Sequence, residues 1–316
     1  MTTYEKIPVL AVVGPTASGK TALGVSLAEY YNGEVVSADS MQIYKGMDIA
    51  TAKPTLEEMK NIPHHLMGFL DMDDSFSVAD YVKLAGDVIK DIHKRNKLPI
   101  IVGGTGLYVS SLLENIQFSE SHKNPKLRNE LMAFANENGA EALHEKLRSI
   151  DPEAAEGIHP NNIVRVVRAL EVCIDTGEKF SVHKTKSKLV ETPYKSCIIG
   201  LNYENRDDLY DRINVRVDKM VEMGLVDEAY QVWKNGDMKT ASNAIGYKEL
   251  IPYFEKKSKL DACIDEIKLQ TRHYAKRQLT WFRKNEHISW IILDKTDNLK
   301  KIQEKSLKVI AKSKIL

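Results

Sequence analysis

The chain has 316 residues, of which 43% are hydrophobic and 28% are charged, and its 45 basic and 44 acidic side chains give a formal net charge of +1. This composition is typical of a soluble globular protein with one large domain or two modest ones, and the balanced charge favours no particular partner. The three cysteines are widely spaced, so the sequence suggests neither a disulfide framework nor a C-x-x-C zinc site. No apolar run is long enough to cross a membrane, so we expect no membrane partner and a cytoplasmic protein.

The first hundred residues alternate the patterns of strands and helices. Short apolar runs predict strands at 9–13, 34–37 and 100–102. Apolar residues at helical spacing predict helices at 21–31 and 78–94. This alternation predicts an α/β fold, in which right-handed crossovers build a parallel sheet flanked by helices.

The first predicted strand leads into a glycine-rich loop that reads GPTASGKT and matches G-x-x-x-x-G-K-[ST]. In such a loop, backbone N–H groups form an anion nest, and the following helix points its positive end at the same place. Lys20 would add a mobile charge, and Thr21 could hold Mg²⁺. A turn that only joins strand to helix is the less favoured alternative. The candidate diphosphate-binding residues are Gly14, Thr16, Ala17, Ser18, Gly19, Lys20 and Thr21.

This loop predicts a diphosphate or triphosphate ligand with magnesium but does not identify the molecule. An ATP-using protein would normally add an acidic residue at the end of another apolar strand to help hold the metal. The best candidate strand here, PIIVGGTG, ends in glycine and threonine instead. A small-molecule kinase is therefore weakened as an interpretation, without being excluded.

Two more polar motifs follow the second and third predicted strands. They are Ser37–Gln42 and Gly104–Gly106, and ligands of doubly wound sheets gather at the carboxyl ends of the strands. Asp39 is therefore expected near the bound phosphates, although a bare carboxylate repels them. It could reach Mg²⁺ through water or act as a base toward a second substrate. A capping role at the next helix or turn is an equal alternative.

From about residue 117 the pattern becomes helical without intervening strands. Pro125, Pro152 and Asn162 stand at the starts of three predicted helices, and Gly139 and Gly177 are expected to end two of them.

We expect a helical insertion domain at 117–196 between two parts of a catalytic core, 1–116 and 197–316. A short strand at 197–201 would return the chain to the sheet, and the remainder is predicted to be mostly helical.

The helix predicted at 206–223 carries an apolar stripe, and Arg216 lies at the edge of that stripe. An arginine at a core edge needs an anionic partner, because unpaired burial of its charge is costly. A ligand phosphate is modestly favoured over a structural ion pair.

Basic and aromatic residues alternate in the stretch 270–287, which includes Arg272 and Arg277. Such mixing suits RNA backbone phosphates together with stacking on unpaired bases. Arg165 and Arg168 lie three apart on one face of an insertion helix. For any one of these residues a solvated helix face is the alternative.

The motifs GPTASGKT, SADSMQIYKGMDIATAKP, PHHL, IVGGTGLYV, RALEV, AIGYKEL and RHYAKRQLTWFRK occur in this order. Together they resemble the bacterial tRNA dimethylallyltransferases, over nearly the whole chain from Val9 to about His287. The resemblance implies transfer of a dimethylallyl group from dimethylallyl diphosphate to N6 of adenosine 37, beside the anticodon of tRNA. It also implies a P-loop NTPase-like core that bears a helical insertion, with a channel that RNA and diphosphate enter from opposite ends.

The resemblance assigns roles to individual positions. Asp39 would be the general base, Thr105 would help to hold the adenine, and Arg216 would act on the diphosphate with Lys20 and Thr21, the latter at Mg²⁺. The tRNA-binding residues implied or expected are Asp39, Ser40, Met41, Gln42, Thr105, Arg165, Arg168, Arg272 and Arg277. We expect a monomer.

The alternatives are an isopentenyltransferase that acts on free adenine nucleotides, the small-molecule kinase, and a non-enzymatic RNA-binding module. The basic aromatic segment and the insertion favour RNA over a free nucleotide. A non-enzymatic RNA-binding module would not explain why Lys20, Thr21 and Asp39 are expected at one site.

Overall fold

A computed structural model describes residues 5–118, 124–187, 189–236 and 244–316. Contacts divide the chain into a larger unit, 1–113 with 193–316, and a smaller one, 114–192. The larger unit is built on a six-stranded sheet in the order β3-β2-β4-β1-β5-β6, in which every pair of neighbours is parallel. The strands are β1 (Ile7–Val13), β2 (Gly33–Ser37), β3 (His64–His65), β4 (Leu98–Gly103), β5 (Tyr194–Tyr203) and β6 (Ile288–Leu293).

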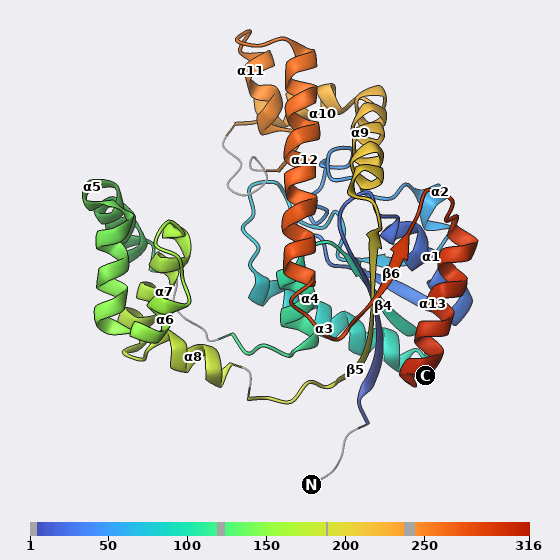
Figure 1. Ribbon diagram of the computed structural model, residues 1–316, viewed down its shortest axis with the longest axis horizontal. Coiled ribbons are helices and arrows are strands. Elements are labelled where there is room, and N and C mark those ends of the chain that lie inside the picture. The colour runs from blue at the N-terminus through green and yellow to red at the C-terminus, as the bar shows by residue number, and fades with distance from the viewer. Residues whose placement is uncertain (1–4, 119–123, 188, 237–243) are drawn as a thin grey trace. The chain divides into compact units, whose positions relative to one another are not determined.

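Helices cover both faces of this sheet (Figure 1). Leu10 and Val12 of β1 pack into a core with α1 and α13, whereas Val9, Ala11 and Val13 pack into a core with α3 and α4. This alternation explains why β1 is apolar throughout, since both of its faces are buried. The helices of this unit include α1 (Lys20–Tyr31), α2 (Leu56–Met59), α3 (Val78–Lys94), α4 (Gly106–Leu113), α9 (Arg206–Glu222), α10 (Leu225–Lys234), α11 (Ile251–Phe254), α12 (Leu260–Phe282) and α13 (Leu299–Ser313), with a 3₁₀ turn η2 (Lys248–Leu250).

A third core lies beside the segment that follows β2. Ile43, Tyr44 and Met47 of this segment pack with apolar residues of α9, α10 and α12, among them Val217 and Ile267. Helices late in the sequence are thereby joined to a loop near its beginning. This packing forms the walls of the site described below.

The smaller unit contains only helices among its described residues: α5 (Pro125–Ile150), α6 (Pro152–Glu156), α7 (Ile163–Thr176) and α8 (Phe180–Lys186). Leu143, Leu147, Val166 and Leu170 lie in its separate apolar core. The buried carboxylate of Asp151 accepts hydrogen bonds from the N–H groups of Ala154 and Ser181 and from the Ser181 hydroxyl, which ties α6 to α8.

Several sequence expectations need correction. Gly139 interrupts α5 as predicted, since its φ of 89° and ψ of 164° are not helical, but a second helical segment follows it directly and runs to Ile150. The strand predicted at 197–201 starts three residues earlier, since residues from Tyr194 onward pair with β1. The strand β6 and the two-residue strand β3 lie where no strand was expected.

No helix among the described residues is both long and apolar enough to cross a membrane.

Candidate active site

The glycine-rich loop joins β1 to the first turn of α1, as the sequence predicts. Gly14, Ala17 and Gly19 have positive φ angles of 143°, 62° and 90°. At Gly14 an added Cβ would lie 2.5 Å from the carbonyl oxygen of Leu201 on β5, so only glycine fits. Ser18 is buried within the loop. This conformation leaves the N-terminus of α1 at one end of the cavity, where it favours an anion.

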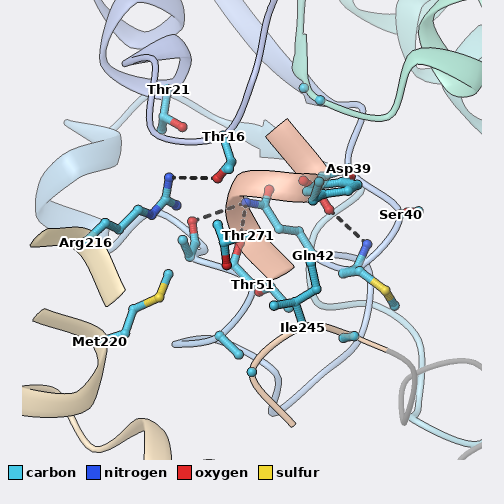
Figure 2. A pocket seen from close by; sticks show the side chains of 18 of the residues that line it. Thr16, Thr21, Asp39, Ser40, Gln42, Thr51, Arg216, Met220, Ile245 and Thr271 are labelled. Carbon is cyan, nitrogen blue, oxygen red and sulfur yellow. Dashed lines mark hydrogen bonds between the residues drawn. The ribbon is translucent and has the colours of Figure 1, made fainter. Parts of the chain in front are cut away.

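Two cations are held beside this loop. The Lys20 ammonium donates to the carbonyl oxygen of Pro15 at 2.6 Å, and a guanidinium nitrogen of Arg216 lies 3.4 Å from the Thr16 hydroxyl (Figure 2). Burial lowers the pKa of Lys20 to about 7, with a further contribution from Arg216, whereas Asp39 opposes the shift. Burial also lowers the pKa of Arg216. Charges disfavoured in this way are stabilised when an anion binds between them.

The carboxyl ends of β2 and β4 form the neighbouring wall. The Thr105 N–H donates to the Ala38 carbonyl at 3.0 Å, and the Ser40 N–H donates to the Thr105 hydroxyl at 3.0 Å. At Gly103 an added Cβ would lie 2.1 Å from the Ala38 oxygen, so this close approach requires glycine. These bonds fix the loops that carry Asp39 and Thr105 against each other.

Asp39 lies in the turn that follows β2 and also borders the cavity. Its Oδ1 accepts a hydrogen bond from the Met41 N–H at 2.9 Å, which is the turn-capping role. Its partly exposed side chain also lines the cavity. Figure 2 shows Asp39 and Ser40 across the cavity from Arg216 and Thr16, with Met220 and Ile245 on a further wall.

The cavity has a volume of about 300 Å³, and all of its lining residues belong to the larger unit. Thr16, Lys20, Thr21, Asp39, Ser40, Met41, Gln42, Arg216 and Arg277 are the sequence-predicted residues that line it. An apolar wall, which the sequence analysis did not identify, is formed by Ile213, Val217, Met220, Leu225, Ile245 and Ile267. Cationic, carboxylate and apolar surfaces therefore meet in one space.

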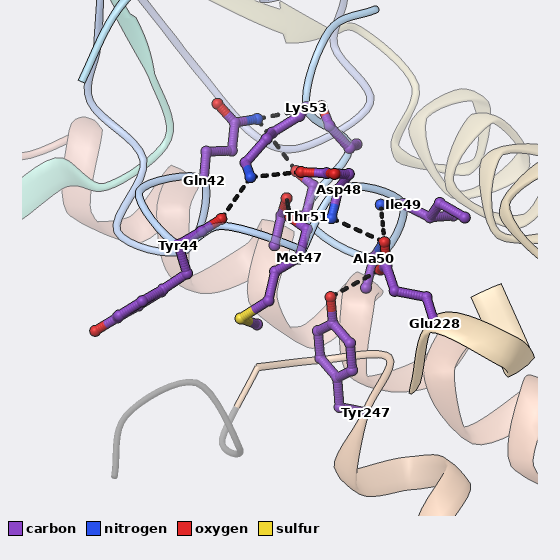
Figure 3. A network of polar contacts seen from close by, with 11 residues as sticks. Gln42, Tyr44, Met47, Asp48, Ile49, Ala50, Thr51, Lys53, Glu228 and Tyr247 are labelled. Atoms are coloured by element: carbon purple, nitrogen blue, oxygen red, sulfur yellow. Dashed lines mark hydrogen bonds and ion pairs between the residues drawn. The ribbon is translucent and has the colours of Figure 1, made fainter. Parts of the chain in front are cut away.

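The loop after β2 is held firmly by polar contacts (Figure 3). The carboxylate of Glu228 accepts hydrogen bonds from the N–H groups of Asp48, Ile49 and Ala50 at 2.8 to 3.0 Å and from the Tyr247 hydroxyl at 2.8 Å. The Gln42 side-chain amide donates to the carbonyls of Thr51 and Ala52 and accepts from the Ser37 hydroxyl. Its side chain is thus engaged within the loop, although it lines the cavity.

The predicted basic residues differ in their surroundings. Arg277 is exposed at the cavity, and its guanidinium carbon lies 5.7 Å from the ring centre of Tyr274. Arg272 is partly buried and donates to the Asn214 side chain at 2.7 Å. Arg165 and Arg168 are exposed on α7 of the smaller unit, where Arg168 pairs with Glu171 at 3.6 Å.

Two residues of α12 reach the site without having been predicted from the sequence. Gln278 is 5% exposed and accepts a hydrogen bond from the Thr16 N–H. Tyr274, one turn earlier, lines the cavity, and burial raises its pKa. The only signal in the sequence was their i, i+4 spacing on one helix face inside the basic segment.

The donors at the site fit a magnesium ion that is held largely by a ligand. The described residues contain no cluster of three or more His, Cys, Asp or Glu side chains suited to a metal. Mg²⁺ commonly takes one or two protein oxygens and completes its shell with substrate phosphates and water. The Thr21 side chain lines the cavity in the first turn of α1 and can supply such an oxygen.

Comparisons with known proteins agree with the geometry. A model of the IPP transferase family matches residues 42–285. A tRNA dimethylallyltransferase of Thermoanaerobacter sp. (strain X514) is 47% identical over 308 residues, covering 96% of this chain and 98% of the relative. A tRNA dimethylallyltransferase of Bacillus subtilis (strain 168) is 49% identical over 286 residues, covering 90% of each chain.

Two solved structures show the same fold. The full-length tRNA isopentenylpyrophosphate transferase from Bacillus halodurans is 45% identical, with a TM-score of 0.71 and 98% coverage of both chains. A eukaryotic dimethylallyltransferase acting on tRNA is 29% identical, with a TM-score of 0.82 over 96% of this chain and 80% of that chain. The α/β fold with a P-loop-type core is thereby confirmed, and the chain belongs to the IPP transferase family, together with the bacterial tRNA dimethylallyltransferases.

Proposed function

We propose that this protein transfers a dimethylallyl group from dimethylallyl diphosphate to N6 of adenosine 37 in tRNA, beside the anticodon, and releases diphosphate. The observation that carries the proposal is the single cavity in which a phosphate loop, an apolar wall and the carboxylate of Asp39 meet. A diphosphate joined to a short hydrocarbon matches the first two surfaces. The names of the relatives support the same reaction.

The diphosphate would lie at the phosphate loop, between Lys20 and Arg216. Negative charge builds up on this group as it leaves, and prearranged cations and N–H groups stabilise that charge. Thr21, with the diphosphate oxygens, would hold Mg²⁺, which when bound supplies further neutralisation of the leaving group. The branched hydrocarbon would pack on the apolar wall near Val217 and Met220.

The bond changes follow from the chemistry of the two substrates. The carbon–oxygen bond to diphosphate breaks, and its electron pair goes to the diphosphate oxygen, while the N6 lone pair forms the new bond to carbon. N6 becomes strongly acidic as this bond forms, because the lone pair that was delocalised into the ring is now shared with carbon. Asp39, which lines the cavity, would take the proton, and Ser40 beside it is held through its N–H by the Thr105 hydroxyl, which itself does not line the cavity.

The tRNA must present an unstacked base to this cavity, since an exocyclic amine within a stacked loop cannot reach the site. Exposed Arg277 at the cavity would contact the RNA, and so would Arg272, which also donates to the Asn214 side chain. Arg165 and Arg168 would contact tRNA from the smaller unit, which we propose is a tRNA-contacting insertion. We also propose that the protein acts as a monomer in the cytoplasm, where its three buried free cysteines suit a reducing compartment.

An acceptor comparison tests the proposal. The protein is incubated with Mg²⁺, dimethylallyl diphosphate labelled in the hydrocarbon, and either an anticodon stem-loop containing adenosine 37 or free AMP, ADP and ATP. We expect label only in the stem-loop, and none when position 37 is guanosine. Label in the free nucleotides alone would instead identify an isopentenyltransferase of small molecules, and turnover of ATP without label transfer would identify a kinase.

A further inference from the structure

We propose that Gln278 is a positioning residue that holds the phosphate loop and the Gly103–Gly106 turn in one fixed arrangement, so that the diphosphate and the acceptor base are aligned for transfer. The inference rests on the proposed function, because it concerns the alignment of those two substrates. Gln278 would touch neither reacting atom. It would act through the phosphate loop, which would bind the diphosphate, and through the Gly103–Gly106 turn, which lies beside the site for the acceptor base.

The contacts of Gln278 join parts of the site that are far apart in sequence. Its Oε1 accepts from the Thr16 N–H at 2.8 Å, and its Nε2 donates to the Gly104 carbonyl at 3.0 Å. The side chain is 5% exposed, so water does not replace these bonds readily. Both ends of one buried amide are therefore used to connect the diphosphate loop to the turn beside the acceptor site.

Each connected loop leads directly to a residue of the proposed reaction. The Thr16 hydroxyl lies 3.4 Å from a guanidinium nitrogen of Arg216. Gly104 is followed by Thr105, whose hydroxyl accepts from the Ser40 N–H. A shift of either loop against Gln278 would change the spacing between the cationic side and the Asp39 side of the cavity.

The turn is shaped to receive α12. At Gly104 an added Cβ would lie 2.1 Å from Nε2 of Gln278, and at Gly106 an added Cβ would lie 2.2 Å from the Trp281 ring. Two glycines thus allow two residues on one face of α12 to approach the turn closely. Gln278 and Trp281 contact the backbone of the turn, so α12 fixes the position of the turn and does not only fill the space beside it.

A neutral amide suits this place better than a charged side chain. Gln supplies one acceptor and two donors from a single planar group, so it satisfies an N–H and a carbonyl at once. It does so without adding a charge between Lys20, Arg216 and Asp39, which line the same cavity. A Met of similar length would fill the space and leave the Thr16 N–H and the Gly104 carbonyl unpaired.

The test compares Gln278→Met and Gln278→Glu with the matched changes Gln270→Met and Gln270→Glu. Gln270 lies on the same helix, but its amide donates to Glu266 one turn away rather than to a loop of the site. We expect Gln278→Met to lower kcat about 10- to 100-fold, as small misplacements of reacting groups do, with KM for tRNA changed less than about threefold. The Gln270 variants should keep wild-type kcat. Rates are expressed per folded enzyme, with thermal unfolding measured for every variant.

The pH profile of Gln278→Glu separates positioning from a purely structural effect. A protonated carboxyl can donate to the Gly104 carbonyl and accept from the Thr16 N–H, whereas an ionised one cannot donate at all. The ratio of its kcat to that of the wild type should therefore rise as pH falls, while the ratio for Gln278→Met stays constant. Gly104→Ala, which presses a methyl group against the amide, should lower kcat in the same range as Gln278→Met.

Wild-type kcat per folded molecule in both Gln278→Met and Gly104→Ala, or a flat ratio for Gln278→Glu, would overturn the inference and leave the proposed function intact. A wild-type protein that transfers no five-carbon group would instead remove the proposed function, and this inference with it.

Discussion

Lys20 gives the most quantitative prediction about the diphosphate site. Burial, together with Arg216, lowers its pKa to about 7, so the side chain of the ligand-free protein loses its proton as the pH rises above this value. A bound diphosphate favours the charged ammonium and raises the pKa again. Binding therefore takes up a proton above pH 7, and the affinity for the diphosphate is expected to fall as the pH rises.

The size of this effect follows from proton linkage. While the pKa of Lys20 in the complex stays above the solution pH, affinity should fall by up to about tenfold for each pH unit above 7. Because about half of Lys20 is already deprotonated at pH 7, the fall between pH 7 and pH 9 amounts to about 50-fold, or ~2.3 kcal/mol. Below pH 7 the contribution of Lys20 should level off, because the ammonium is already formed in the free protein.

Calorimetric titration with dimethylallyl diphosphate, in buffers of different ionisation enthalpy, measures affinity and proton uptake together. The range from about pH 7.5 to 9.5 is suitable, because terminal phosphates have a second pKa near 6 and stay ionised throughout it. Lys20→Arg keeps its charge across this range and should give a flat profile. Lys20→Met should give weaker binding with an equally flat profile.

A wild-type affinity that does not change between pH 7.5 and 9.5 would refute this reasoning. The same decline in Lys20→Met as in the wild type would refute it too, since the titrating group would then lie elsewhere.

Three other changes test separate parts of the site. Asp39→Asn should lower kcat at least ~100-fold, with tRNA affinity changed only a few-fold, because the substitution removes the proton acceptor and keeps the shape of the side chain. Single-turnover rates measure the first effect and filter binding measures the second. Near-normal turnover would show that Asp39 is not the proton acceptor. Arg216→Ala should weaken diphosphate binding about 10- to 100-fold by losing a charge-assisted contact, and an effect on tRNA affinity alone would contradict its placement. Glu228→Ala should lower the free energy of unfolding by ~3 kcal/mol or more, because three loop N–H groups and the Tyr247 hydroxyl lose their acceptor; urea unfolding, with exposed Asp227→Ala as control, should show no such loss in the control.

The sequence was sufficient to predict how the site assembles at the strand ends. Parallel strands carry their carboxyl ends to one edge, so loops after β1, β2 and β4 had to meet wherever the strands paired. Lys20, Asp39 and Arg216 line one cavity as a result. Helix α3 begins and ends at the predicted residues, because Ser77 with Asp80 forms a capping box at its start.

Contacts between distant side chains could not be predicted in this way. Thr16 and Gln278 are 262 positions apart, and Glu228 binds a loop about 180 positions before it. No local pattern marks such pairs, because they depend on how α10 packs beside the segment after β2 and how α12 packs on the sheet.

In the proposed reaction the phosphate loop holds a leaving diphosphate, and no phosphoryl group moves. The most direct test uses dimethylallyl diphosphate with a heavy-oxygen label at the bridge between carbon and phosphorus, together with unmodified tRNA and Mg²⁺. Mass spectrometry of both products should find a five-carbon unit on adenosine 37 and all of the heavy oxygen in the released diphosphate. Heavy oxygen retained on the carbon product, or a phosphorylated nucleoside in place of the alkylated one, would contradict the account.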